Sequence, residues 1–155
     1  MNPKAFQDNY PDALSHCYGC GRLNEHGHQL KSYWDGAETI AHFTPQPYHT
    51  AIPGYVYGGL IASLIDCHAT GTASAAAARA AGLEMSDGQA QRFVTAALKV
   101  DFLKPTPIGV TLELRGKISE LKDRKVVVEV TLYANGVACA RGEVVCVRMP
   151  EEMLG

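Results

Sequence analysis

Two glycines and one carboxylate have the most chemically suggestive spacing in this chain. Gly58 and Gly59 open a long apolar run, and Asp66 follows Gly58 by eight residues. The first N–H groups of a helix lack an intrahelical partner, so they suit a negative or polarised oxygen, and glycine lets a ligand approach them closely. A carboxylate in an Ala/Leu/Ile helix is costly to bury without a reason. The pair predicts a site that stabilises developing charge on an oxygen, as in attack on a carbonyl.

Helical periodicity places the carboxylate on a polar face. Residues three and four apart share one side of a helix, and this side carries Gly59, Ser63, Asp66 and Thr70. The opposite side, which we expect to face a sheet, carries Ile61, Leu64, Ile65, Ala69 and Thr72. A polar stripe on a buried helix indicates a cleft or an interface. Asp66 is therefore either a catalytic residue or a residue that forms structural hydrogen bonds at a subunit interface.

The spacing also limits how the two features can cooperate. Eight helical residues span about 12 Å at ~1.5 Å per residue. One carbonyl carbon cannot lie within ~3–3.5 Å of Asp66 while its oxygen binds the start of the same helix. Either the glycines only allow close packing, or the two groups come from facing helices of two copies.

The rest of the chain predicts the elements that must position this helix. The helix is expected from Gly58 to about Ala81, where Gly82 ends it, and a surface segment through 85–89 follows. Strands are predicted over 29–34, 39–43, 92–103, 110–121, 125–134 and 137–148. Asn135-Gly136 is a strong hairpin signal. This order predicts an α+β fold in which a curved antiparallel sheet of about six strands wraps one helix, with open edges that commonly pair with a second copy.

Length and composition favour one domain over residues 1–155, with an irregular segment at 1–28 and a frayed tail at 149–155. The formal net charge is −2 and no Lys/Arg run exceeds two residues, so we expect neither nucleic acid nor an anionic membrane as partner. The chain shows no signal-peptide pattern, and its five cysteines are typical of a reducing cytoplasm.

A second group of residues has metal-ligand character. Cys17 and Cys20 have C-x-x-C spacing, and His26 and His28 follow closely. Zinc accepts such ligands, but His-x-His separates its two imidazoles unless the loop folds tightly. We therefore favour a glycine-assisted turn with small buried side chains and expect no metal. His68, about 200° around the helix from Asp66, is expected to be a core or interface histidine.

The run from His49 to Gly59, followed by Asp66, resembles the hotdog-fold acyl-CoA thioesterases of the phenylacetate-pathway (PaaI-like) type. Two further segments are similar to that family. One is Cys17-Tyr18-Gly19-Cys20-Gly21 with Asn24 and Gly27, and the other is Asp101-Phe102-Leu103-Lys104-Pro105 with Gly109. The likeness covers roughly residues 17–148. One position departs from it, because the family's usual histidine before Gly-Gly is Tyr57 here.

The resemblance implies a hotdog fold and hydrolysis of an acyl-CoA thioester at a dimer interface. We expect a homodimer or a dimer of dimers (a homotetramer). Asp66 would be the nucleophile or general base, and Gly58 and Gly59 of the partner would bind the oxyanion. Thr70, one turn after the carboxylate, matches a threonine that assists the attacking water in part of the family. No metal or redox cofactor is implied, and coenzyme A enters as part of the substrate.

Other candidates have weaker support. Tyr57 either donates its hydroxyl near the thioester or fills the volume of the missing histidine, and His49 could orient water. The substrate-binding candidates are Ser63, Asn24, Lys104 and Arg92. Two alternative functions stay open: a non-catalytic acyl-CoA binding protein, which Tyr57 favours, and a hydroxyacyl-thioester dehydratase.

Overall fold

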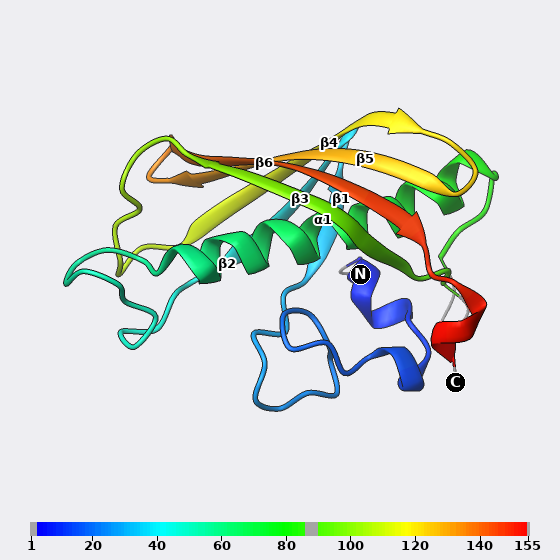
Figure 1. The fold of residues 1–155 in the computed structure, drawn as a ribbon, viewed down its shortest axis with the longest axis horizontal. Coiled ribbons are helices and arrows are strands. Elements are labelled where there is room, and N and C mark those ends of the chain that lie inside the picture. Colours follow the sequence, from blue (N-terminus) through cyan, green and yellow to red (C-terminus); the bar gives the residue numbers. More distant parts are fainter. Residues whose placement is uncertain (1–2, 86–89, 155) are drawn as a thin grey trace.

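A computed structural model describes residues 3–85 and 90–154, in which one long helix lies against one six-stranded sheet (Figure 1). The helix α1 spans Gly58–Ala80. The strands are β1 (Ser32–Asp35), β2 (Glu38–Phe43), β3 (Phe93–Phe102), β4 (Leu112–Leu121), β5 (Lys125–Ala134) and β6 (Val137–Arg148). Their order across the sheet is β1-β2-β4-β5-β6-β3, and every pairing is antiparallel. The predicted α+β architecture is confirmed.

Local sequence signals set most element ends. Asn135 and Gly136 both have positive φ, 52° and 76°, as a type I′ turn between β5 and β6 requires. Gly82 has φ 72°, and the N–H of Leu83 bonds the carbonyl of Ala78, which closes α1 with a Schellman motif. Residues 86–89 of the predicted surface segment lie outside the described residues.

The predicted start of the first strand is wrong. The strand begins at Ser32 instead of residue 29, because Gln29 has φ 52° and cannot extend the strand. The segment expected to fray contains a 3-10 helix, η3 (Glu151–Leu154), in which the N–H of Met153 bonds the carbonyl of Pro150, and its fraying stays a prediction.

The N-terminal segment is more ordered than its composition suggests. It contains two short 3-10 helices, η1 (Phe6–Asn9) and η2 (Asp12–Leu14), so the prediction of an irregular segment is only partly right. This segment lies on the side of α1 away from the sheet (Figure 1). The Phe6 and Tyr10 rings are buried, and the Tyr10 hydroxyl lies 3.4 Å from Ser74 Oγ on α1. The sheet and this segment thus enclose the C-terminal half of the helix from two sides.

Two glycines bring the sheet close to α1. A Cβ at Gly142 on β6 would lie 2.5 Å from Ile65 Cγ2, and one at Gly116 on β4 would lie 2.4 Å from Thr39 Oγ1. Real Cβ atoms do not approach so closely, so both positions need glycine for the observed packing. Alternate residues of β5, including Val128, Val130 and Leu132, are fully buried in the core between sheet and helix.

A buried polar network crosses the helix–sheet interface on the side of α1 opposite the polar face. His68 is fully buried, with Nδ1 2.8 Å from Ser32 Oγ and Nε2 3.0 Å from Thr39 Oγ1. Thr39 Oγ1 also lies 2.7 Å from Thr72 Oγ1. Burial lowers the pKa of His68 to about 4, so the imidazole is neutral at physiological pH. The prediction of a core histidine is confirmed.

The sheet leaves β1 and β3 as its edges. β3 is the longer edge and is exposed along most of its length, including Leu98 (41% exposed) and Phe102 (56% exposed). A long edge with apolar side chains is the kind of surface that pairs with another chain. No helix within residues 3–85 and 90–154 is long and apolar enough to span a membrane.

Candidate active site

Asp66 lies where α1 meets the open edge of the sheet. Its side chain is half-buried, and its Oδ1 accepts a hydrogen bond from the Thr95 hydroxyl on β3. Burial raises the pKa of Asp66, while the Thr95 bond and the positive charge of Arg92 oppose that rise. A carboxylate in this setting is basic enough to accept a proton and still has one oxygen free of a protein hydrogen bond among the described residues.

Thr95 was missed by the sequence analysis. The register between β3 and β6 shifts between Thr95 and Ala97, which marks a β-bulge at this point. Bulges redirect side chains, and here the threonine hydroxyl points to Asp66. The sequence shows only that Thr95 carries a hydroxyl in the predicted strand 92–103. It does not reveal which helix residue that hydroxyl contacts.

The start of α1 presents free N–H groups. Among the described residues, no backbone hydrogen bond uses the N–H of Gly58 or Gly59. Tyr57, the residue before the helix, is 57% exposed, and its side chain makes no cap bond. A Cβ at Gly59 would lie 2.4–2.5 Å from the Tyr57 ring carbons and hydroxyl, so the phenol folds back over Gly59. The phenol and the free N–H groups therefore face the same small region.

His49 supports this helix start through its backbone. Its carbonyl accepts the N–H of Tyr57 at 2.9 Å, and its Nδ1 accepts the N–H of Gln46 at 2.9 Å. The half-buried ring also contacts His28 and Phe43. The structure therefore places His49 beside the glycine pair at the start of α1, eight helical residues before Asp66.

Two hydroxyls of the polar face bond back into the helix. Ser63 Oγ donates to the carbonyl of Leu60 at 2.7 Å, and Thr70 Oγ1 donates to the carbonyl of Cys67 at 3.2 Å. Thr70 is only 5% exposed, whereas Ser63 is half-buried. In this arrangement both hydroxyls donate their proton to a carbonyl of the helix, but their oxygen atoms can still accept a hydrogen bond.

The expected substrate-binding residues are dispersed. Arg92 stacks its guanidinium 4.8 Å from the centre of the Tyr10 ring and borders a pocket of about 770 Å³ together with Arg124 and Arg148. Asn24 uses both polar atoms within the N-terminal loop, bonding the carbonyl of His16 and the N–H of His26. Lys104 is exposed, just after β3. Only Arg92 is electrostatically coupled to Asp66.

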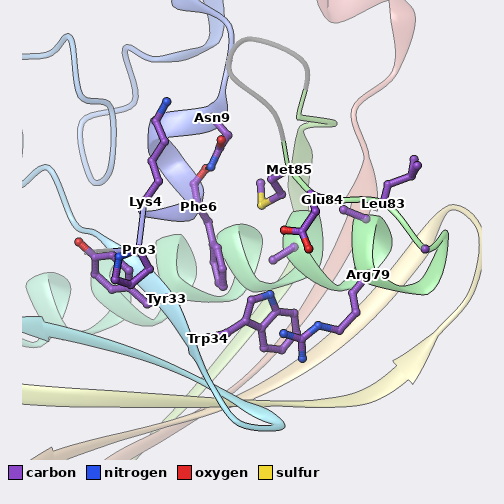
Figure 2. Close-up of a pocket in the computed structure, with 13 residues that line it drawn as sticks. Pro3, Lys4, Phe6, Asn9, Tyr33, Trp34, Arg79, Leu83, Glu84 and Met85 are labelled. Atoms are coloured by element: carbon purple, nitrogen blue, oxygen red, sulfur yellow. The ribbon is translucent and has the colours of Figure 1, made fainter. Parts of the chain in front are cut away.

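A separate pocket of about 700 Å³ lies near the other end of α1 (Figure 2). It is lined by Phe6, Tyr33 and Trp34 among others, and the Arg79 guanidinium lies 3.5 Å from the centre of the Trp34 ring. None of the predicted site residues lines it. This pocket is therefore separate from the residues that carry the expected chemistry.

The two halves of the candidate site cannot meet within one chain. The helix is continuous from Gly58 to Ala80, so the predicted separation of about 12 Å between its start and Asp66 holds. What one chain offers is a half-buried carboxylate near the middle of α1 and, separately, backbone N–H groups without a backbone partner at its start.

Comparisons with known proteins place this architecture in a family. A crystal structure of a thioesterase superfamily protein from Shewanella loihica PV-4 is 59% identical, with a TM-score of 0.69, and covers 90% of this chain and 98% of that one. The E. coli PaaI protein of the phenylacetic acid degradation operon shares the hotdog fold at 16% identity, with a TM-score of 0.62, over 79% of this chain and 81% of that chain.

A curated relative and a family model agree. Acyl-coenzyme A thioesterase THEM4 of Xenopus laevis is 31% identical over 102 residues, which are 64% of this chain. The chain spans only 40% of the length of that relative. The family model described as Thioesterase superfamily matches residues 53–140, more than half of the chain and the whole region from the helix start through β5. The chain therefore belongs to the thioesterase superfamily, with a hotdog fold.

Proposed function

We propose that this protein hydrolyses an acyl-CoA thioester to a carboxylic acid and free coenzyme A. The observation that carries the proposal is the half-buried carboxylate of Asp66, raised in pKa and held by Thr95 at the open edge of the sheet in a thioesterase-superfamily chain. Such a group can take a proton from water as it attacks the thioester carbon, or attack that carbon itself.

The proposed site is shared between two copies. Gly58 and Gly59 of the partner would donate their free N–H groups to the oxyanion while Asp66 acts on the carbon. The exposed β3 edge next to Asp66 supports this arrangement, because pairing along it would bring a second helix close to the first. The Tyr57 phenol would donate to the same oxygen, and its position over Gly59 supports this role. Tetrahedral collapse then expels the coenzyme A thiolate.

Each step uses groups of the protein and water, so the proposed reaction needs no metal or redox cofactor. Among the substrate-binding candidates, Arg92 has the best support, because it borders a pocket with two further arginines suited to the phosphates of coenzyme A. Lys104 and Asn24 stay as weaker candidates. The five free cysteines of the described chain fit the proposed cytoplasmic location.

Turnover of an acyl-CoA panel tests the function. Short, long, branched and aryl acyl-CoAs would be supplied to wild type, Asp66→Asn and the control Asp12→Asn, whose side chain is 82% exposed. We expect release of the thiol by wild type and control, and a loss of several orders of magnitude in Asp66→Asn. Full activity of Asp66→Asn would remove the mechanism. Tight binding without turnover by any folded variant would favour the acyl-CoA binding protein, and conversion of a hydroxyacyl substrate to an enoyl product would favour the dehydratase.

Mixing two inactive variants tests the shared site. Gly58→Pro removes one N–H at the first helical position, where proline is tolerated, and Tyr57 has the extended ψ of 129° that suits a residue before proline. When Gly58→Pro chains are mixed with Asp66→Ala chains, each dimer that contains one chain of each kind keeps one intact site. Random exchange makes half of the dimers mixed, so activity should recover to about a quarter of wild type. A site within one chain would show no recovery.

A further inference from the structure

Three cysteine thiols converge beside the candidate carboxylate, which the sequence did not reveal. The Sγ atoms of Cys17, Cys20 and Cys67 all lie within 4.8 Å of one another, and those of Cys17 and Cys67 are 3.8 Å apart. We call these three residues the cysteine cluster. Cys67 directly follows Asp66 on α1, whereas Cys17 and Cys20 come from the N-terminal loop.

The loop is shaped to bring these thiols together. The N–H of Gly21 bonds the carbonyl of Cys17 at 2.7 Å, which closes the predicted turn. A Cβ at Gly19 would lie 2.3 Å from Cys67 Sγ, so only glycine allows the loop to approach the helix this closely. His26, a candidate zinc ligand in the sequence, is instead 83% exposed, and His28 packs against the Tyr18 and Phe43 rings.

Cys17 is the thiol that this environment activates. Hydrogen bonding with the thiols of Cys20 and Cys67, together with the N–H groups of Cys20 and Gly19, lowers its pKa. In the Cys17–Cys67 contact either sulfur can be the donor. The same contact with Cys17, together with burial, raises the pKa of Cys67. Cys17 is half-buried, whereas Cys20 and Cys67 are buried. Cys17 is therefore both the most accessible thiol of the cluster and the one that these contacts favour as the thiolate.

The positive charge of Arg92, a partly buried residue, also favours the thiolate form in the cysteine cluster. The Arg92 guanidinium interacts electrostatically with all three sulfur atoms. Among the described residues it forms no ion pair with a carboxylate, and its Nη1 donates to the carbonyl of Phe93. A cation near a thiol favours the thiolate, which is the nucleophilic form.

We propose that the cysteine cluster is an oxidation site in which Cys17 reacts with a hydroperoxide and Cys67 resolves the product as a disulfide. The Cys17 thiolate attacks the terminal oxygen, the O–O bond breaks, and Cys17 becomes a sulfenic acid. The alkoxide takes from solvent the proton that the Cys17 thiol released on ionising. The Cys67 sulfur then attacks the Cys17 sulfur. Its proton joins the leaving hydroxide to form water, so two thiols and one hydroperoxide give one disulfide, one alcohol and one water.

The geometry allows Cys67 to be the partner of Cys17. Their sulfur atoms are already in contact at 3.8 Å and must close to about 2.05 Å in the disulfide. That bond would tie the N-terminal loop to α1 at the residue after Asp66. Transient disulfides of this kind are the usual form in reducing compartments.

The test is peptide mapping of the reduced full chain after brief treatment with hydrogen peroxide, with a sulfenic-acid trap present in parallel. Wild type should form a Cys17–Cys67 disulfide about tenfold or more faster than Cys139 or Cys146 is oxidised, because those thiols lack comparable activation. Cys67→Ser should accumulate the trapped sulfenic acid at Cys17. The matched control, Cys146→Ser, removes a buried thiol outside the cluster and should behave as wild type.

Several results would overturn the proposal. A Cys17–Cys20 disulfide in wild type would remove Cys67 from its role. Oxidation of Cys17 no faster than that of Cys139 would show that the thiolate is not activated. A third such result is one bound zinc ion per purified chain that must be removed before peroxide reacts with the cysteines. It would identify the cluster as a metal site. Because every readout is a mass or a metal content, the test does not depend on thioesterase activity. The disulfide map of wild type still decides the case if Cys67→Ser does not fold.

Discussion

Lowering the pH from 7.5 to 5 should destabilise the fold through one buried histidine. His68 is neutral in the folded protein because burial lowers its pKa from 6.5 to about 4. The unfolded chain therefore binds a proton more readily than the folded chain between these two values. The stabilisation is fully present above pH 6.5 and is lost as the pH falls toward 4.

The size of the effect follows from the two pKa values. At pH 5 the unfolded histidine is almost fully protonated, whereas the folded one is almost neutral. Linkage then gives a loss of about 2 kcal/mol in the free energy of unfolding between pH 7.5 and 5. This is a substantial part of the stability of an ordinary domain.

Urea unfolding at fixed protein concentration and at several pH values measures this loss. His68→Gln keeps a polar side chain but cannot titrate, so its free energy of unfolding should be about 2 kcal/mol less sensitive to pH over this range. Subtracting the two profiles removes other groups, including Asp66, whose raised pKa acts in the opposite direction. His26→Gln, at an exposed histidine, is the matched control and should keep the wild-type profile. Equal pH sensitivity of His68→Gln and wild type would refute the account of a neutral buried imidazole.

Three further outcomes are expected. Thr95→Val removes the hydroxyl that bonds the charged form of Asp66, so the acid limb of kcat/KM against pH should move to higher pH, and an unmoved limb would deny Thr95 that influence. Gly116→Ala places a Cβ 2.4 Å from Thr39 Oγ1 and should lower the free energy of unfolding by about 1–3 kcal/mol in urea titrations. Gly136→Ala puts a side chain at φ 76° with nothing within 4 Å, so its cost should be only the backbone strain, about 1 kcal/mol, in the same assay.

The sequence predicted best those elements whose ends are set by residues within or directly beside them. The β5–β6 hairpin has the predicted bounds, because Asn135-Gly136 fixes both the turn and the register of the strands beside it. The end of α1 follows from Gly82 for the same reason. The face of α1 that meets the sheet also follows from helical period alone, with Leu64 and Ile65 buried as expected.

Contacts between distant segments could not be predicted. Phe6 and Tyr10 carry no periodic signal, yet both become buried against other parts of the fold. Thr95 reaches Asp66 only because a bulge redirects it, and Cys67 joins Cys17 across fifty positions of sequence. In each case the pairing depends on how the N-terminal segment or the β3 edge docks on α1, which no local pattern encodes.

The His68 network also controls the direction of the candidate carboxylate. His68 and Asp66 are two residues apart, so their side chains leave α1 about 200° from one another. The bonds to Ser32 and Thr39 permit one rotational setting of the helix about its own axis. A shift by one residue would turn the helix by about 100° and carry Asp66 away from Thr95. An apolar residue in place of His68 would keep the core filled but would not hold the helix in this setting. A substitution on the face of the helix that packs against the sheet would therefore change the direction of Asp66 on the opposite face.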